Sequence, residues 1–446
     1  IDFTWGNRIF LLAFKKGRKG KSLMRKVLVI TYYWPPAGGP GVQRWLKFVK
    51  YLRDFNIEPV VYIPENPNYP IQDTSLLDEV PEGIKIYTHP IKEPYRLASL
   101  LSSHKTKRIS SGIIKTKNQS LLEKAMLWVR GNFFIPDARK NWVKPSITYL
   151  AEVITSEAID TVVTTGPPHS AHLIGQGLKR KHKLKWVADF RDPWTSIGYH
   201  KKLKLTNTSK EKHKRLEGEV LNNADAIVVT STTTKKEFMG LTEVPIHVIT
   251  NGYDVDVSKT LELDAKFTIA HIGSLLTGRN PSNLWTVLSQ LVKENEAFRD
   301  ALELHLIGVV SEDVLDNIYG HGLQSYVHLE DYLSHDEAVK RQQESQILLM
   351  VEINSNETVG IIPGKVFEYL AAKRPILAIG PEGWDVGGII KECQAGHVFD
   401  YQDRERLKNV LLEWFMAYRK SELQIASHSI EKYSRKALTG KLAEIL

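Results

Sequence analysis

The sequence has few of the features that stabilise secreted proteins or anchor membrane proteins. Cys393 is the only cysteine among 446 residues, so an internal disulfide cannot form, which fits a reducing compartment and predicts a cytoplasmic protein. No apolar run reaches the ~18 to 20 residues that a membrane-spanning helix needs. The 42% of hydrophobic residues can therefore build large cores. Because a single core stops growing near ~250 to 300 residues, two domains are expected.

Several signatures of ligand binding are also missing. No G-x-G-x-x-G follows a predicted strand, which disfavours a nicotinamide cofactor. No convincing cluster of metal ligands is visible, so no metal is expected. The formal charge of +9 indicates an anionic partner, which could be nucleic acid, anionic lipid or a phosphorylated substrate. Helix-turn-helix, RRM and zinc patterns are absent, so nucleic acid is not the expected partner.

The first residues differ from the rest of the chain. A short apolar piece is followed by basic residues, which is the reverse of a secretory signal, and Met24 then directly precedes a predicted strand. We therefore predict that residues 1–23 are an upstream extension and that the native start is Met24. The alternative is a basic tail that contacts a membrane.

Two sets of β-branched runs alternate with amphipathic stretches. The first set is "KVLVIT", "EPVVYI", "GIKIYT", "DTVVTT", "KWVAD" and "DAIVVT", and the second is "FTIAHIG", "LELHLIG", "YVHLE", "QILLMV", "PILAIG" and "GHVFD". Such alternation predicts parallel sheets covered on both faces. The expected fold is α/β, with two doubly wound Rossmann-like domains that face a cleft. We place the domains at residues 24–255 and 256–420, with a final helix in 421–446 that packs back on the first domain.

Glycines follow the first predicted strand in "YYWPPAGGPGVQRWLKF". Gly38 and Gly39 would let the backbone approach a ligand closely, and the helix that begins near Val42 offers free N–H groups to a phosphate. In the second half, "HIGSLLTGRNPSN" places Arg279 ahead of a helix, where a guanidinium can bind a diphosphate through two parallel hydrogen bonds.

The stretch "IIPGKVFEY" follows the strand "QILLMV". Gly364 forms the corner, Lys365 lies in the first helical turn, and Glu368 follows one turn later. Lys365 and the helix start favour phosphate, while Glu368 could accept hydrogen bonds from two neighbouring hydroxyls of a ribose. The spacing alone is equally typical of a surface pair worth only ~0.2 to 0.5 kcal/mol.

These motifs together resemble the family 4 glycosyltransferases of the B fold. The motifs occur in one order, as "YWPPAGGPGVQRWLKFVKYL", "TTGPPHSAHLIG", "WVADFRDPWT", "ADAIVVTS", "ITNGYD", "HIGSLLTGRNP" and "IIPGKVFEYLAAKRPILAIG". The resemblance runs from about Lys26 to the C-terminus. It is strongest to a bacterial subgroup with "DFRDPW" that is often found in surface polysaccharide and lipopolysaccharide assembly.

The resemblance implies transfer of a sugar from a nucleotide diphosphate sugar to an acceptor hydroxyl, with retention of configuration and without a metal or other cofactor. The C-terminal domain would hold the donor and the N-terminal domain a carbohydrate or lipid-linked acceptor. The residues that would bind the donor are Gly38, Gly39, Arg279, Gly364, Lys365 and Glu368. One departure from the family pattern is Gly360, where many members have a second glutamate near the transferred sugar. Glu357 lies close in sequence and is a candidate substitute.

The acceptor side is expected around "VADFRDPWTSIGYH" and "TTGPPHS". A carboxylate or imidazole there could orient or deprotonate an acceptor hydroxyl. We select Asp192 and His169 as the catalytic candidates. Asp189 and Arg191 are equally explained as a buried structural ion pair, and His200 is expected to be a surface residue.

A basic segment of the first half, "HKTKRISSGIIKTKNQSLLEKAMLWVRGNFFIPDARKNWVKP", mixes lysines and arginines with apolar residues. Such a segment can lie on an anionic membrane, so the inner face of the cytoplasmic membrane is a candidate partner surface. The alternative is that its aromatic residues belong to the core. Two other functions remain open: a nucleotide or nucleic-acid binding protein without catalysis, and a B-fold nucleotide-sugar epimerase. No feature of the sequence indicates an oligomeric state.

Overall fold

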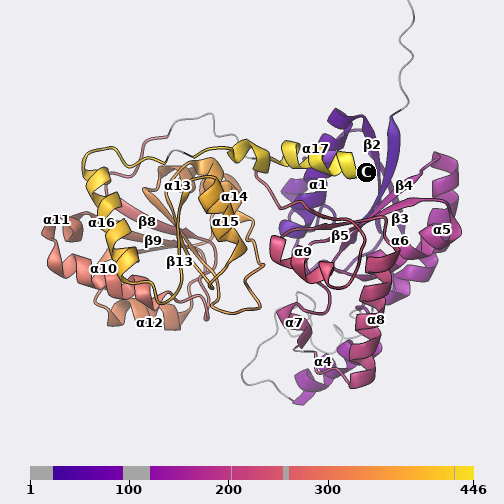
Figure 1. Cartoon of the computed structure of the whole chain (residues 1–446), viewed down its shortest axis with the longest axis horizontal. Helices are drawn as coiled ribbons and strands as arrows, with labels where there is room; N and C mark the ends of the chain where they lie inside the picture. Colours follow the sequence, from indigo (N-terminus) through magenta and orange to yellow (C-terminus); the bar gives the residue numbers. More distant parts are fainter. Residues whose placement is uncertain (1–23, 94–120, 202, 255–260, 426) are drawn as a thin grey trace, which may run out of the picture.

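The computed structural model describes residues 24–93, 121–201, 203–254, 261–425 and 427–446. The prediction for residues 1–23 lies outside this range, as does part of the basic segment. Two parallel sheets, each flanked by helices, lie side by side in Figure 1. The prediction of two doubly wound α/β domains is therefore confirmed.

The N-terminal sheet has seven strands in the order β3-β2-β1-β4-β5-β6-β7. Its strands are β1 (Arg25–Ile30), β2 (Ile57–Pro64), β3 (Lys85–His89), β4 (Thr161–Gly166), β5 (Lys185–Phe190), β6 (Ala226–Val229) and β7 (Ile246–Val248). Its helices are α1 (Pro40–Leu52), α4 (Leu121–Phe133), α5 (Lys140–Glu157), α6 (Ser170–Lys181), α7 (Gly198–Lys201), α8 (Asn207–Asn223) and α9 (Thr232–Met239). The strand β7 was not predicted, because it has three residues and lies where the hydrophobic pattern lapses.

The C-terminal sheet has six strands in the order β10-β9-β8-β11-β12-β13. Its strands are β8 (Phe267–Ile272), β9 (Leu302–Ile307), β10 (Val327–Glu330), β11 (Ile347–Val351), β12 (Ile376–Ile379) and β13 (Gly396–Phe399). The helices are α10 (Ser282–Glu294), α11 (Glu296–Ala301), α12 (Glu312–Gly320), α13 (His335–Glu344), α14 (Lys365–Ala372), α15 (Asp385–Glu392), α16 (Glu405–Arg419) and α17 (Arg435–Ile445). Short 3-10 turns cover Arg53–Phe55, Thr74–Leu77, Gln324–Tyr326 and Ile430–Tyr433.

Each sheet has a hydrophobic core on both of its faces. Successive side chains of a strand point to opposite faces, so Val27 and Val29 join one core while Leu28 and Ile30 join the other. Both sets are fully buried because helices cover both faces. This arrangement explains why the strands read as continuous β-branched runs.

The chain after α16 crosses from the C-terminal half to the N-terminal half and ends there in α17, as the yellow segment of Figure 1 shows. Leu438 and Leu442 of α17 pack into the core that α1 covers. The crossing is tied to residue Tyr253, whose N–H donates to the Tyr433 carbonyl at 3.1 Å and whose carbonyl accepts from Arg435 N–H at 2.9 Å. The end of the chain therefore helps to hold the two halves together.

Candidate active site

Two predicted cations meet at the carboxyl ends of the C-terminal strands. Lys365 begins α14, and its Nζ donates to the carbonyl of Ile272 at the end of β8, over 3.3 Å. Gly273 comes next with φ +116°, and a β-carbon there would lie 3.3 Å from Lys365 Nζ. Burial and the nearby Arg279 lower the pKa of Lys365 from 10.5 to about 8. The ammonium is therefore short of negative partners, which an anionic ligand would supply.

Arg279 is fixed by a glutamate that the sequence analysis missed. Its Nε and Nη2 donate to Oε1 of Glu352 at 3.2 and 2.9 Å, and Glu352 is only 1% exposed. The same oxygen accepts from the Ile353 N–H at 2.8 Å. Glu352 directly follows β11, so its place at the end of a buried strand was the available sequence evidence. The pair leaves Nη1 of Arg279 without a hydrogen bond to any described residue.

Glu368 lies one turn beyond Lys365 and accepts from Gln342 Nε2 of α13 at 3.0 Å. It lines a cavity of about 380 Å³ between the two halves, opposite Lys47 and Asp73 of the N-terminal half. Lys365 and Glu368 make no ion pair with each other in the part of the chain that the structure describes. The surface-pair interpretation is therefore wrong, and Glu368 is available to the cavity.

The glycine loop after β1 lies close to neighbouring backbone. Gly39 caps α1 with φ +98°, a conformation that favours glycine. Gly38 donates to the Ile71 carbonyl at 3.0 Å, and a β-carbon there would lie 3.0 Å from the Ile71 side chain. A β-carbon at Gly41 would overlap the Arg191 guanidinium, so Arg191 joins this loop to the end of β5.

Residues of the C-terminal half also reach the N-terminal half. Glu357 is exposed, and its Oε2 would lie 2.6 Å from a β-carbon at Gly198 of α7. Gly364 caps α14 with helical dihedral angles. The loop between β11 and α14 therefore carries Glu357 toward the N-terminal half, while Gly364 and Lys365 remain at the carboxyl ends of the C-terminal strands.

A second cavity, of about 280 Å³, lies at the carboxyl ends of β1, β4 and β5. Both predicted catalytic residues, His169 and Asp192, line it, together with His200 and His213. His200 is only 8% exposed, so its prediction as a surface residue is wrong. The error arose because α7 is a single turn that the hydrophobic pattern does not reveal. Its ring lies edge-on to His213, with centroids 4.5 Å apart.

The electrostatics of this cavity favour neutral imidazoles and a more basic carboxylate. Burial and the neighbouring His172 hold the pKa of His169 well below its usual range, and burial lowers the pKa of His200 to about 4. Neither ring nitrogen of His169 has a hydrogen-bond partner among the described residues, and its ring stacks on Trp194 at 4.8 Å. Burial raises the pKa of Asp192, which makes it a stronger base than an ordinary aspartate.

Asp189 and Arg191 do not pair with each other. Asp189 is fully buried and accepts from Arg44 Nη2 at 2.8 Å, Trp45 Nε1 at 2.7 Å and Thr165 Oγ1 at 2.9 Å. Burial acts to raise its pKa, but Arg44 and these hydrogen bonds hold the pKa below its usual value. Asp189 therefore has a structural role, as the ion-pair interpretation predicted, but it pairs with Arg44 rather than with Arg191. Arg191 donates to the Pro167 carbonyl.

The described part of the basic segment is divided between core and surface. Leu127 of α4 is buried, whereas Trp128 and Phe133 are 42% and 59% exposed. Arg130 and Gly131 of the same helix line the cavity that His169 and Asp192 also line. Within the described residues, no helix is both long enough and apolar enough to cross a membrane. The helix α4 therefore joins an exposed aromatic surface to the cavity.

Comparison with known proteins agrees with this geometry. Residues 115–257 match the model of Glycosyltransferase Family 4. No curated protein sequence matches the chain significantly. The structure is similar to a glycosyltransferase from Rickettsia africae (TM-score 0.57, 14% identity, 94% of this chain and 97% of that one). It also resembles WaaG, a glycosyltransferase involved in lipopolysaccharide biosynthesis (0.51, 14%, 94% and 99%), and S. aureus TarM with bound UDP (0.55, 13%, 95% and 99%).

The two-sheet architecture is that of the GT-B glycosyltransferases, and the carboxyl ends of both sheets hold the polar residues described above. Residues 115–257 match a family 4 glycosyltransferase domain, and the chain as a whole has the fold of glycosyltransferases such as WaaG. The resemblance predicted from the sequence is thereby confirmed for residues 115–257 by the family model and for the whole chain at the level of the fold.

Proposed function

We propose that this enzyme transfers a sugar from a nucleotide diphosphate sugar to an acceptor hydroxyl, with retention of configuration and without a metal. The observation that carries the proposal is the grouping of Lys365, Arg279 and the start of α14 at the carboxyl ends of β8 and β11, with Glu368 facing a cavity between the domains. Fixed cations beside a helix start can stabilise the charge that develops on a departing diphosphate.

The donor would lie between the two halves of the chain. Its diphosphate would accept hydrogen bonds from Lys365 and Arg279, and the loop with Gly38 and Gly39 would close from the other side. Glu368 would accept hydrogen bonds from two ribose hydroxyls. The UDP bound to TarM supports a nucleotide donor by analogy of fold.

The acceptor hydroxyl would enter the cavity lined by His169 and Asp192. A neutral His169 with unpaired ring nitrogens can accept a hydrogen bond from a hydroxyl, and Asp192, with its raised pKa, can receive the proton. Glu357 approaches from the donor domain beside Gly198 and is our candidate for the carboxylate that Gly360 lacks.

We further propose that the acceptor is a carbohydrate, free or carried on a lipid, in bacterial surface polysaccharide or lipopolysaccharide assembly. The aromatic surface of α4 adjoins the acceptor cavity, so a protein bound to the inner face of the cytoplasmic membrane could take a lipid-linked acceptor from it. The similarity to WaaG supports this setting by fold alone.

The test is a panel of UDP-, GDP- and TDP-sugars incubated with purified protein. At least one donor is expected to raise the melting temperature and to be hydrolysed slowly to free nucleotide and sugar. Glu368→Ala should abolish donor binding with an unchanged circular dichroism spectrum, whereas Glu344→Ala, a carboxylate of α13 that does not line the cavity, should bind normally. A panel with neither stabilisation nor hydrolysis contradicts the proposal. Release of a 2-epimer without acceptor would identify an epimerase instead.

A further inference from the structure

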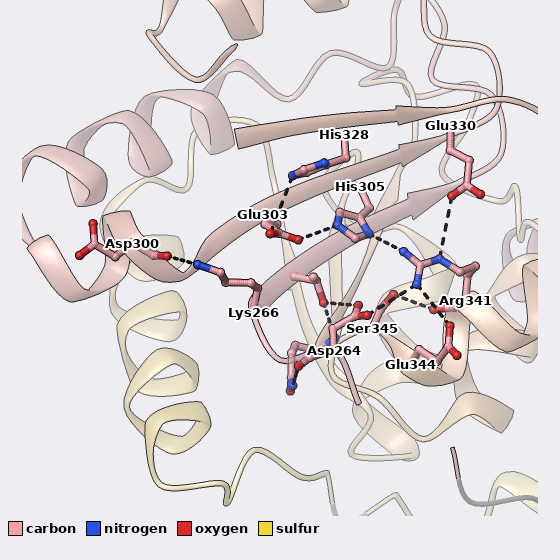
Figure 2. Close-up of polar contacts among 12 residues, drawn as sticks. Asp264, Lys266, Asp300, Glu303, His305, His328, Glu330, Arg341, Glu344 and Ser345 are labelled. Carbon is pink, nitrogen blue, oxygen red and sulfur yellow. Dashed lines mark hydrogen bonds and ion pairs between the residues drawn. The ribbon is translucent and has the colours of Figure 1, made fainter. Parts of the chain in front are cut away.

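We propose that Glu303, His305 and His328 form a binding site for a zinc-type divalent cation on the C-terminal sheet (Figure 2). Glu303 and His305 are two residues apart on β9, so their side chains share one face of the sheet. His328 lies opposite His305 on the edge strand β10. One ligand atom from each residue lies within 4.8 Å of the others.

This site is separate from the proposed active site. Donor-side residues follow the carboxyl ends of the strands, whereas Glu303 is the second residue of β9 and His305 the fourth. The proposal therefore does not depend on the transfer reaction. It rests on the side chains of three described residues and on the charges around them.

The distances between the side chains suit a small metal ion. His305 Nε2 lies 3.0 Å from Glu303 Oε2, and His328 Nε2 lies 3.9 Å from Glu303 Oε1. Two ligands that are each ~2.0 to 2.2 Å from a tetrahedral zinc ion are roughly 3.3 to 3.6 Å apart, between these two values. Two imidazoles and one carboxylate favour Zn²⁺, Co²⁺ or Ni²⁺ over Mg²⁺ and Ca²⁺, which prefer oxygen ligands.

The charge around the site also favours a cation. Figure 2 shows Arg341 of α13 between acidic side chains, with Glu344 at 3.2 Å, Asp264 at 3.6 Å and Glu330 at 3.9 Å. With Glu303, the connected network holds four carboxylates, and its cations are Arg341 and Lys340, the latter paired with Glu344. The buried Arg374 also acts on Asp264, which leaves one negative charge uncompensated while both histidines are neutral. A cation at the site would therefore be favoured.

Arg341 sets the condition under which the metal can bind. Its Nη2 donates to Nδ1 of His305 at 2.7 Å. Because a guanidinium can only donate, the proton of a neutral His305 ring lies on Nε2, which donates to Glu303. A metal on Nε2 would shift that proton to Nδ1, with no net proton release, and Arg341 would turn fully to its carboxylates. The Arg341 contact therefore competes with the metal.

The test measures Zn²⁺ affinity by competition with a chromophoric chelator, using tag-free protein, and follows Co²⁺ by its visible absorption. Wild-type protein is expected to bind one equivalent. His328→Asn and Glu303→Gln should each weaken binding at least about tenfold. His328 is 56% exposed on its side chain, so its substitution leaves the fold intact. His428→Asn is the matched control, because His428 is an exposed histidine remote in sequence from these ligands.

Arg341→Met removes the competing donor and should tighten Zn²⁺ binding about tenfold. Tighter binding in Arg341→Met together with weaker binding in His328→Asn supports the site. The proposal is overturned if wild-type protein binds no stoichiometric Zn²⁺ at about 100 µM, or if His328→Asn binds as tightly as wild type. An unchanged Zn²⁺ affinity in folded Arg341→Met would show that Arg341 does not compete with the metal for His305.

Discussion

Gly360 of the C-terminal half lies directly against Thr233 of the N-terminal half. A β-carbon at Gly360 would lie 3.0 Å from Cβ of Thr233 and 3.2 Å from Oγ of Ser231. Asp385 also binds the start of α9, because its carboxylate accepts from the Thr233 N–H at 2.9 Å and from Thr233 Oγ1 at 3.0 Å. The position at which family members often have a glutamate is therefore part of a contact between the domains.

This contact predicts the outcome of restoring the glutamate. Gly360→Glu should not improve catalysis, because its side chain would push the start of α9 away and weaken domain closure. Donor-dependent compaction, measured by small-angle X-ray scattering, should be smaller than in wild type, and turnover should fall at least about tenfold. Gly360→Ala needs a shift of only a few tenths of an ångström and serves as the control. Higher turnover with normal compaction in Gly360→Glu would contradict this account.

Lys365 should make donor binding depend on pH. Its pKa of about 8 means that the ammonium, which is the form that attracts a diphosphate, is lost as the pH rises through 8. Donor affinity measured by calorimetry should fall roughly tenfold per pH unit above that value. Lys365→Met should bind weakly with no step near pH 8. If wild type and Lys365→Met gave parallel profiles, Lys365 would not contact the diphosphate.

Lys365→Met should also stabilise the fold. The pKa of Lys365 is lower in the folded chain, about 8, than the ordinary 10.5. The unfolded chain therefore binds more protons between these values, and the free energy of unfolding of wild type decreases as the pH falls from 10.5 to 8. At pH 7, Lys365→Met removes the free-energy cost of keeping a buried ammonium charged. It also removes the hydrogen bond to the Ile272 carbonyl, so the free energy of unfolding is expected to rise by roughly 2 kcal/mol. Denaturant unfolding measures this change, and a lower free energy of unfolding in Lys365→Met than in wild type would contradict the prediction.

Two aspartates of the "DFRDPW" motif should respond in opposite ways to the same substitution. Asp192→Asn should lower transfer to the acceptor at least about 100-fold, because a base is lost, while donor affinity and the free energy of unfolding stay close to wild type. Asp189→Asn should instead destabilise the fold by about 3 to 5 kcal/mol, because Arg44 is left buried without its carboxylate. Equal loss of stability in both variants would place Asp192 among the structural residues.

The sequence predicted twelve of the strands. The central ones are runs of apolar residues buried on both faces, whereas the edge strands β3 and β10 are largely exposed. Leu28 and Val29 point to opposite sides of β1, yet both are fully buried, so the run has no polar interruption. The strand β7 was missed because three residues at a sheet edge, Ile246–Val248, carry too short a pattern. The turn α7 was missed for the same reason.

The site was only partly predictable because side-chain pairing depends on contacts between distant parts of the chain. The positions of Lys365 and Arg279 after strands indicated phosphate binding from local sequence. The partners Glu352 and Arg44 could not be assigned, since they lie 73 and 145 residues away from Arg279 and Asp189 respectively. His200 reaches the acceptor cavity only because α7 turns it inward.

The exposed aromatic residues of α4 lead to a prediction about membrane binding. Trp128 and Phe133 lie on the helix that also lines the acceptor cavity, and their rings are in edge contact at 5.7 Å. Aromatic side chains at a lipid interface add apolar burial to the attraction between basic residues and anionic headgroups. The double variant Trp128→Ser, Phe133→Ser should therefore lose about tenfold in affinity for anionic liposomes in a sedimentation assay.

Met239 and Leu241 provide a matched control, because they are 60% and 49% exposed on a different part of the N-terminal half. Their replacement by serine should leave sedimentation unchanged. Binding of wild type should fall as salt rises, since the electrostatic part is screened over about 10 Å at 0.1 M. Equal recovery of the protein on neutral and anionic liposomes would show that electrostatic attraction does not contribute to binding. Equal loss in the control variant would show that any exposed apolar pair suffices, and α4 would then have no special relation to the acceptor.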